Sequence, residues 1–259
     1  MTVDGDAFRG AANPILSRIR ALHAVPPFQA ELLTRTIRRT ETHSAGSVLH
    51  AEGDAPMRPL AIVAGWAIRQ RMLSDGRRQI LAFHLPGDLM GVNLHAHPMA
   101  ATTAVALTDL VVADASELRE VVSNCNPDYP DLLKAVDLVD AEEEERQLEH
   151  IVRLGRLTAY ERLAHFLVDV SYRLDAVGMV QNGTYPFPLT QEQVGDALGL
   201  SAVHVNRTLQ QLRRDGLVTL RGARLGLANR GRLAEVAEFR RSVPGAATRA
   251  AGGPAPSPG

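Results

Sequence analysis

The residues whose types and spacing could do the most specific chemistry lie between positions 189 and 218. A helix predicted from Ser201 has apolar residues at i, i+4 and i+7, so its amides and guanidinium groups share the opposite face. Arginine can bind guanine O6 and N7 with two hydrogen bonds, asparagine or glutamine can pair with adenine, and valine can contact the thymine methyl group. This face therefore has the chemistry to read base edges in the major groove of DNA.

The polar face of this helix defines a set of candidate DNA-binding residues. Five of them cluster opposite the apolar stripe, three flank that cluster, and the others lie at the helix starts and in the hairpin that follows. The set is Val203, Asn206, Arg207, Gln210 and Arg214 on the central face, Ala202, His204 and Arg213 beside it, and Thr190, Gln191, Ser201 and Arg221 nearby.

Two short helices must position these residues. Thr190 is a good N-cap, and Gln193, three residues later, completes a capping box, so a first helix is predicted to begin here. Gly199 ends that helix, and Ser201 caps the second one. The pattern predicts a helix-turn-helix, whose second helix enters the major groove in proteins that bind DNA this way.

The region around the second helix is locally basic. Residues 217–220 and 224–228 are predicted to form a wing hairpin around residues 221–223. Between positions 201 and 241 there are nine arginines and three acidic residues, in a chain whose formal net charge is −1. A local excess of six positive charges suits a surface that contacts phosphates. The alternative is a solvated amphipathic helix pair, which any helical protein could contain.

The bulk properties predict a soluble globular protein. With 259 residues and 45% hydrophobic content, the chain is long enough for two domains. It has no apolar run long enough to span a membrane and no signal-peptide pattern, so we expect a cytoplasmic protein without a membrane partner. Cys125 is the only cysteine, which excludes an internal disulfide and a cysteine-ligated iron–sulfur cluster within one subunit. A small buried residue is the favoured interpretation of Cys125, ahead of a redox switch.

The segment from about 44 to 113 is predicted to form a β-sandwich or roll, because short apolar runs alternate with glycine-containing turns. Its clearest hairpin joins residues 66–73 to residues 78–85, and residues 101–113 are predicted to form another long strand. A short lead-in helix is expected within residues 1–25, closed by Pro26 and Pro27.

A long helix is predicted from Asp131 to about Leu157. Its apolar spacing is interrupted by four consecutive glutamates at 142–145, which we interpret as a solvated face. The helix could pair with the same helix of a second subunit. A DNA-binding protein with one groove-binding helix gains specificity when it dimerises and contacts both half-sites of a palindrome. Alternatively, it is a lone surface helix that covers the β domain.

Two further helices are predicted at residues 158–174 and 232–239. The tail at 242–259 is rich in Ala, Gly, Pro and Ser and is predicted to be disordered.

The order of roll, long helix and winged helix resembles the Crp/Fnr family of bacterial transcription regulators over about residues 12–241. The strings that carry the resemblance are Ala-Gly-Trp-Ala at 64–67, Leu-Ser-Asp-Gly-Arg-Arg-Gln-Ile-Leu at 73–81, Leu-Pro-Gly-Asp-Leu-Met-Gly at 85–91 and Gly-Arg-Leu-Thr-Ala-Tyr-Glu-Arg-Leu-Ala at 155–164.

The resemblance implies an α+β protein with a cyclic-nucleotide-binding-like jelly roll at 1–128, a dimerisation helix at 129–157 and a winged helix-turn-helix at 158–241. It implies a homodimer that binds palindromic promoter DNA, with RNA polymerase as a further possible partner, and an effector that changes how the DNA-binding domains are presented. By position, Arg207 matches the family arginine that reads guanine. The glutamate common four residues earlier is Val203 here, and the position before it is Ala202, so the half-site is expected to differ.

The pattern for binding a cyclic nucleotide is missing. The family's Gly-Glu pair is Gly91-Val92 here, and residues 99–101 (Met-Ala-Ala) lie near the position of its Arg-Ser or Arg-Thr pair. There is no Lys or Arg between Arg78 and Arg119, so we expect the site to lack a guanidinium group for a buried phosphate. Cyclic AMP and cyclic GMP are therefore not expected as effectors, and no cofactor is predicted.

Three histidines leave a second class of protein open. His84, His95 and His97 could bind a transition metal or haem, as in a cupin-like metal-binding protein with an accessory winged helix. The usual cupin glutamate is missing after the His-x-His pair, and polar loop histidines are the favoured interpretation, so no metal site is assigned. A third possibility is a winged helix that binds a protein. No nucleophile–base pair was found, and the chain is expected not to be an enzyme.

Overall fold

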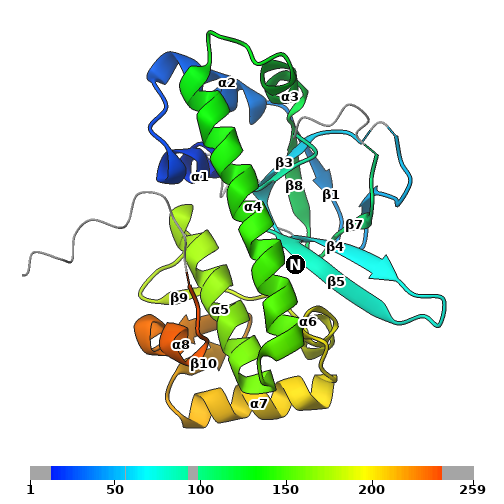
Figure 1. The fold of residues 1–259 in the computed structure, drawn as a ribbon, viewed down its shortest axis with the longest axis vertical. Coiled ribbons are helices and arrows are strands. Elements are labelled where there is room, and N and C mark those ends of the chain that lie inside the picture. Colours follow the sequence, from blue (N-terminus) through cyan, green and yellow to red (C-terminus); the bar gives the residue numbers. More distant parts are fainter. Residues whose placement is uncertain (1–12, 56, 93–98, 241–259) are drawn as a thin grey trace, which may run out of the picture.

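In the computed structural model, the chain consists of a β-roll, one long helix and a helical C-terminal part. The structure describes residues 13–55, 57–92 and 99–240. Helix α4 (Pro130–Arg156) runs along the molecule, with the roll beside it and the C-terminal helices around its last turns (Figure 1). The predicted α+β class and the order of its parts are confirmed.

The helices are α1 (Pro14–Leu22), α2 (Pro27–Thr36), α3 (Ser116–Ser123), α4 (Pro130–Arg156), α5 (Ala159–Ala176), α6 (Gln191–Leu198), α7 (Ala202–Arg214) and α8 (Arg230–Val236). The strands are β1 (Thr40–His43), β2 (Val48–His50), β3 (Leu60–Ala64), β4 (Ala67–Met72), β5 (Arg78–His84), β6 (Leu89–Met90), β7 (Thr103–Ala106), β8 (Leu110–Asp114), β9 (Thr184–Pro186), β10 (Val218–Arg221) and β11 (Arg224–Leu227). The roll has two sheets, with strand orders β1-β8-β3-β6 and β2-β7-β4-β5, and the C-terminal part has a third, β10-β11-β9.

The predicted hairpin in the roll is confirmed as β4 and β5. Its two strands are antiparallel, with Met72 opposite Arg78. The turn is stabilised because Asp75 Oδ1 accepts a hydrogen bond from the backbone N–H of Arg77 at 3.0 Å, while Gly76 adopts a φ of +84° that favours glycine.

The long strand predicted at residues 101–113 is wrong, because this segment forms two strands in different sheets. β7 pairs with β2 and β4, whereas β8 pairs with β1 and β3. Between them the backbone N–H groups of Leu107 and Thr108 both donate to the carbonyl of Trp66. The chain can fold closely here because Gly65 stands beside it, and a Cβ on Gly65 would lie 2.2 Å from the carbonyl oxygen of Asp109.

The N-terminal prediction needs a correction at its end. α1 stops at Leu22, and Pro27 is the first residue of α2, a second helix that the sequence analysis missed. Proline is compatible with this position because the first helical N–H has no partner within the helix. Pro26 and Pro27 therefore begin the second helix, as its N-cap and first residue. Helix α3 was missed as well.

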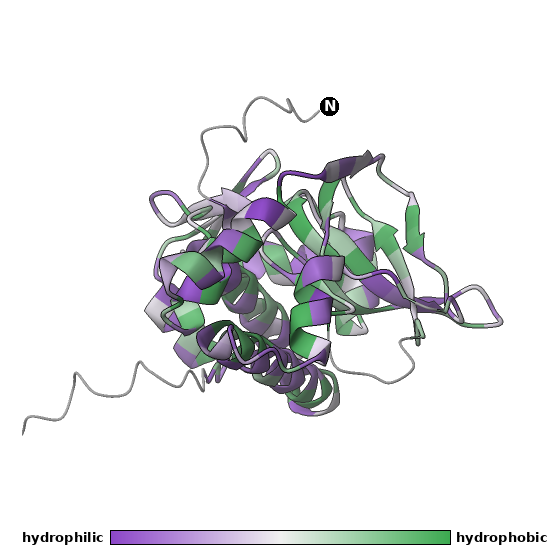
Figure 2. Ribbon diagram, turned by 90° about the horizontal axis from the view of Figure 1, so that it is seen from above, coloured by the Kyte–Doolittle hydropathy of each residue, from purple (hydrophilic) through white to green (hydrophobic). Residues whose placement is uncertain are grey.

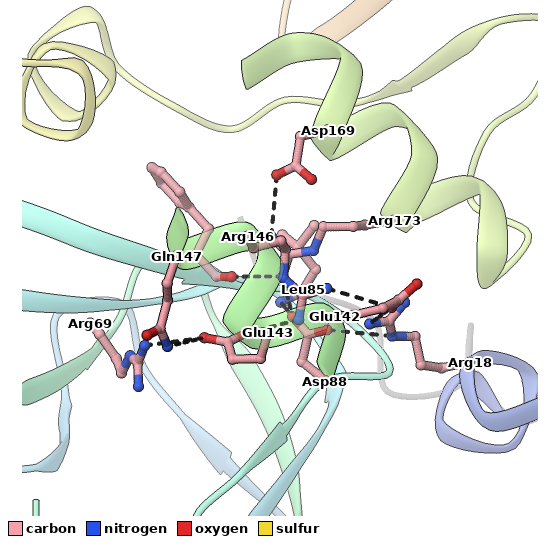
Figure 3. A network of polar contacts seen from close by, with 11 residues as sticks. Arg18, Arg69, Leu85, Asp88, Glu142, Glu143, Arg146, Gln147, Asp169 and Arg173 are labelled. Carbon is pink, nitrogen blue, oxygen red and sulfur yellow. Dashed lines mark hydrogen bonds and ion pairs between the residues drawn. The ribbon is translucent and has the colours of Figure 1, made fainter. Parts of the chain in front are cut away.

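Helix α4 has the predicted extent to within one residue at each end, but its four consecutive glutamates are not all solvated. Glu142 forms ion pairs with Arg18 and Arg146, and Glu143 forms ion pairs with Arg69 and Arg146 (Figure 3). Burial raises the pKa of Glu143, but the charge on Arg146 outweighs it and holds that pKa well below its usual range. The solvated interpretation is wrong for these two residues because arginines of the roll and of α1 face them.

The roll and the C-terminal part share one continuous core. Trp66 of the roll meets Phe187 edge to face with ring centroids 6.5 Å apart, and Phe83 of β5 lies 5.1 Å from Phe166 of α5. A buried ion pair joins Arg173 of α5 to the Asp88 carboxylate. The two halves therefore pack directly on each other within one chain.

Seen from above, the strands of the roll carry both apolar and polar residues, and the protruding β4–β5 hairpin is largely hydrophilic toward its tip (Figure 2). Within the described ranges, no helix is both long and apolar enough to cross a membrane. Cys125 is exposed, with a φ of +45°, so the prediction of a buried cysteine is wrong. The tail predicted to be disordered lies outside the described residues.

Candidate nucleic-acid interface

Helix α6 begins with the predicted capping box. Thr190 Oγ1 accepts from the backbone N–H of Gln193 at 3.2 Å, and Gln193 Oε1 accepts from the backbone N–H of Thr190 at 2.9 Å. Gly199 ends the helix with a left-handed φ of +64°. Gly195 is a further requirement that the sequence analysis missed, because a Cβ there would lie 2.4 Å from the carbonyl oxygen of Leu200. The tight approach of α6 to the following turn therefore needs glycine inside the helix.

Helix α7 presents its predicted apolar stripe to the core. Ser201 Oγ accepts from the backbone N–H of His204 at 3.2 Å and caps the helix. Val205, Leu209 and Leu212 are buried, as the spacing predicts. Thr208 is buried beside them, which the pattern of apolar residues alone did not indicate. Burial of this stripe fixes the rotation of α7 and leaves the opposite face in solvent.

The structure brings the central candidate residues together on that solvent face. Most of the set is exposed, and Asn206 is half-buried. Val203 has 62% of its surface exposed, which is unusual for a valine on a helix that is otherwise well packed. Within the described residues, the Arg207 guanidinium has no hydrogen bond or ion pair. The exposed members of the α7 set are Ser201, Ala202, Val203, His204, Arg207, Gln210, Arg213 and Arg214.

The predicted wing is present as β10 and β11, and β9 adds a third strand. Arg221 lies opposite Arg224 at the tip, where Gly222 has a φ of +59°. Both arginines are exposed, and Arg224 Nη2 donates to the carbonyl of Thr184 at 3.4 Å. The wing therefore carries two outward guanidinium groups at the end of the hairpin.

The first helix of this domain, α5, anchors both helices of the helix-turn-helix. Arg162 donates to the carbonyls of Leu157 at 2.8 Å and Leu198 at 3.1 Å, which ties the end of α6 to the start of α5. Tyr160 donates its hydroxyl to Asp215 Oδ2 at 2.6 Å, at the end of α7. Burial, followed by this hydrogen bond, raises the pKa of Tyr160 to about 12. The reading face is thus held on a rigid support.

A second candidate site is the cavity inside the roll, which has a volume of about 330 Å³ and is closed on one side by α4. The expectation that no guanidinium group reaches it is wrong, because Arg69 of β4 and Arg146 of α4 both line it. Both are engaged by Glu143, at 3.1 Å and 2.8 Å. The cavity therefore has guanidinium groups, but neither is left unpaired for a phosphate.

Of the three candidate metal-binding histidines, the structure describes only His84. His84 is a buried residue of β5, with 4% of its surface exposed, so its interpretation as a loop residue is wrong. Successive side chains of a strand point to opposite faces of the sheet, and the side chain of His84 points into the roll. His95 and His97 lie outside the described residues. Among the residues that the structure describes, no three His, Cys, Asp or Glu side chains are grouped so as to hold a metal ion.

Comparison with protein families gives two matches along the chain. Residues 161–236 match the Crp-like helix-turn-helix domain, and residues 40–124 match the cyclic nucleotide-binding domain. The first match covers α6, α7 and the wing, and the second covers the strands of the roll.

Similar proteins come from the same group. The nitrogen fixation regulation protein FixK of Bradyrhizobium diazoefficiens is 32% identical over 68% of this chain and 73% of its own length. The transcriptional activator protein FnrL of Cereibacter sphaeroides is 29% identical over 73% of this chain and 75% of its own length. The structure of FixK2 from Bradyrhizobium japonicum aligns with a TM-score of 0.65 and 29% identity, over 76% of this chain and 96% of that one.

These relatives are regulators, which decides against the cupin-like class that the histidines had left open and against an enzyme. The domain matches and the similarity to FixK agree with the outward polar face of α7 and with the roll that precedes it. The chain therefore belongs to the Crp/Fnr family of DNA-binding transcription regulators.

Proposed function

We propose that the protein binds a palindromic promoter site as a homodimer, with α7 of each subunit in the major groove. The observation that carries this proposal is the solvent face of α7, where an unpaired Arg207 stands beside Val203 and Asn206 on a helix whose other face is buried. A face of this kind has no packing role within the chain. Its side chains match the donors, acceptors and apolar contacts that base edges offer.

Each residue of the set has a proposed role. Arg207 reads a guanine through O6 and N7, Asn206 or His204 contacts the neighbouring base pair, and Val203 contacts a thymine methyl group. The other members position the protein on phosphates and carry no sequence information of their own. These phosphate-contacting members are Thr190, Gln191, Ser201, Ala202, Gln210, Arg213, Arg214 and Arg221.

Helix α4 supplies the proposed dimer contact. Three large apolar side chains on it remain exposed, namely Leu148 at 58%, Ile151 at 66% and Val152 at 47%. Leu148 lies seven residues from both Ala141 and Gly155, which is the repeat of a coiled-coil seam. Elsewhere the helix packs against α1, α2, α3 and α5 and forms an ion pair with Arg69 of the roll, so a symmetry mate can cover the free seam.

The division into a sensor roll at 1–128, a dimerisation helix at 129–157 and a DNA-binding domain at 158–241 follows from these roles. α4 and α5 fall on either side of the proposed boundary near Thr158, which is the N-cap of α5. Because a promoter-binding protein works where bacterial DNA lies, we infer a cytoplasmic location. Contact with RNA polymerase belongs to the same proposal.

The experiment is a selection from a random duplex library with the purified protein at fixed moderate salt and no added effector. The expected result is enrichment of a palindrome whose half-sites lie about one helical turn apart, about 10 base pairs centre to centre. An Arg207→Ala variant selected in parallel should lose the preference for guanine at one position of each half-site. Enrichment of an asymmetric single site would contradict the dimer. If nothing is enriched even with host extract added, the DNA-reading role is wrong.

A further inference from the structure

A small polar cavity lies where helices α1, α4 and α5 meet, and we call it the junction cavity. Its lining comes from these three helices and from the two residues Phe239 and Arg240 after α8, and no strand of the roll contributes to it. Arg240 is exposed, so the cavity opens to solvent. Its volume is about 50 Å³. A buried water needs about 10–15 Å³ and a site for an organic molecule about 300 Å³ or more, so the junction cavity has the size for a small ion.

Three buried arginines bring hydrogen-bond donors without partners to this cavity. Arg18 of α1, Arg153 of α4 and Arg173 of α5 line it, and they are 3%, 5% and 9% exposed. Within the described residues, the Nε–H group of each has no hydrogen-bond partner. Buried polar groups in folded proteins are nearly always paired, and an orphaned one calls for an explanation. Three such donors around one small cavity indicate that an acceptor binds there.

The three guanidinium groups differ in their counter-charges. Arg18 pairs with Glu142 at 2.5 Å, and Arg173 pairs with Asp88 (Figure 3). Arg153 has neither a hydrogen bond nor an ion pair in the part of the chain that the structure describes. One buried positive charge at the junction therefore lacks a direct partner.

The two carboxylates that attract Arg153 most strongly are already engaged by other side chains. Glu149 Oε2 lies 3.1 Å from Nε2 of His165, and Asp169 Oδ2 lies 3.9 Å from Nη1 of Arg173. Burial outweighs the attraction of both carboxylates and lowers the pKa of Arg153. Arginine nevertheless keeps its proton in proteins, and a buried charge without a partner is costly.

His165 also lines the cavity, but it does not add a donor. Its Nε2 donates to the Glu149 carboxylate, so Nδ1 of the neutral ring is an acceptor. Burial lowers the pKa of His165, which keeps the ring neutral at pH 7. The donors that the cavity offers are therefore the guanidinium groups.

We propose that the junction cavity binds one small monovalent anion of the size of chloride, which accepts hydrogen bonds from the Nε–H groups of Arg18, Arg153 and Arg173. A single negative charge is enough, because Arg18 and Arg173 already have carboxylate partners and Arg153 lacks one. The bound anion links three helices that are far apart in sequence, so its role is to stabilise their junction. This inference goes beyond the proposed reading of DNA and does not depend on it.

The first test is urea unfolding of the full-length protein without DNA, at fixed protein concentration and constant ionic strength, with sodium chloride replaced stepwise by sodium gluconate. Gluconate is too large for the cavity. If one chloride binds the folded chain alone, the folding equilibrium constant should rise by up to about tenfold for each tenfold increase in chloride.

Two variants locate this effect. Arg153→Met keeps most of the bulk of the side chain and removes its charge and its donor, so the chloride dependence should disappear. Arg156→Met is the matched control, since Arg156 is an exposed arginine of the same helix, and it should respond to chloride like the parent. Equal chloride dependence in the parent and in Arg153→Met would overturn the proposal, and so would a parent that does not respond to chloride.

A second measurement locates the ion directly and needs no variant, so it decides the question even if Arg153→Met folds poorly. Crystals of the full-length protein grown in sodium bromide should show an anomalous scattering peak inside the junction cavity, within hydrogen-bond reach of Arg153 Nε. Bromide found only at exposed arginines would be adventitious surface binding and would contradict the site.

Discussion

Arg78 of strand β5 donates from Nε to Oδ2 of Asp196 in helix α6 at 2.7 Å, which joins the hairpin of the roll to the first helix of the helix-turn-helix. The two side chains are 28% and 23% exposed, and they lie 118 residues apart in sequence. Beside them, Gln79 donates to the carbonyl of Ala197 at 3.5 Å. The hairpin therefore connects the roll to the DNA-binding domain.

Replacing Asp196 with alanine should weaken this connection between the hairpin and α6 without unfolding either half. Because the pair is partly exposed, we expect a loss of stability of about 1 kcal/mol or less. Amide hydrogen exchange should become faster in β5 and α6 while the distal β1 and β8 keep their protection. The matched control is Asp75→Ala, which removes an ion pair with Arg77 at the exposed tip of the same hairpin. If both variants exchange alike, the pair does not connect the two halves.

Asp88 should be far more important for stability than an exposed carboxylate. It is buried, accepts from the backbone N–H of Leu85 at 2.7 Å, and forms ion pairs with Arg18 and Arg173 (Figure 3). Asp88→Asn removes one counter-charge from each of two buried guanidinium groups and leaves them only Glu142 and Asp169 as carboxylate partners, so urea unfolding should show a loss of about 3 kcal/mol.

The control for Asp88 is Asp175→Asn, since Asp175 pairs with Arg230 at 2.8 Å but is 46% exposed. That variant should lose no more than about 1 kcal/mol. Equal losses in the two variants would show that the buried network adds nothing beyond a surface pair.

His84 should make stability fall with acid in a defined window. Burial, with a smaller opposing effect from Glu143, lowers its pKa from 6.5 to about 4 in the folded chain. Between those values the unfolded chain takes up a proton that the folded chain does not, so the free energy of unfolding decreases as the pH falls. The contribution is about 3 kcal/mol over the whole window. Denaturation of His84→Leu at several pH values should give a smaller slope than the parent.

An unchanged slope in His84→Leu would contradict the assignment. Asp88 acts in a separate window. Burial raises its pKa, but Arg173 and Arg18 outweigh this and lower it, so its contribution is present above a pH of about 4 and is lost below it.

The seam of α4 should control the proposed dimer. A charge at Leu148 or Ile151 would be buried against its symmetry mate, so Leu148→Glu and Ile151→Glu should sediment as monomers and bind the selected operator at least about tenfold more weakly. Met72→Glu makes the same kind of change at an exposed apolar residue, 54% exposed, at the end of β4. That control should remain dimeric. A dimer that survives both α4 variants would place the contact elsewhere.

Arg207 and Arg213 should differ in the kind of binding that they support. Arg207→Ala should lose about 1–3 kcal/mol of discrimination at one base pair of the half-site while keeping its circular dichroism spectrum. Arg213→Ala should instead weaken binding to all sequences alike and reduce the salt dependence by about one phosphate contact. Measurement of both variants on the selected site and on a guanine-substituted site distinguishes these effects, and equal losses on both duplexes for Arg207→Ala would remove its base-reading role.

The sequence by itself determined the elements that depend on near neighbours. The capping box of Thr190 and Gln193, the stripe that begins at Val205 and the hairpin turn around Gly76 involve residues a few positions apart, so local patterns were enough to predict them. The outward face of α7 followed directly, because a helix with one buried stripe has only one face left for recognition.

Only the tertiary structure decided the features that join distant segments. The sequence indicated a solvated Glu143, but in the structure Arg69 of the roll, 74 residues away in sequence, pairs with it. The sequence also indicated a cavity without guanidinium groups, but β4 and α4 each contribute one to its wall. The charge state and partners of a buried group depend on which segments pack together. Spacing along the chain does not specify that packing.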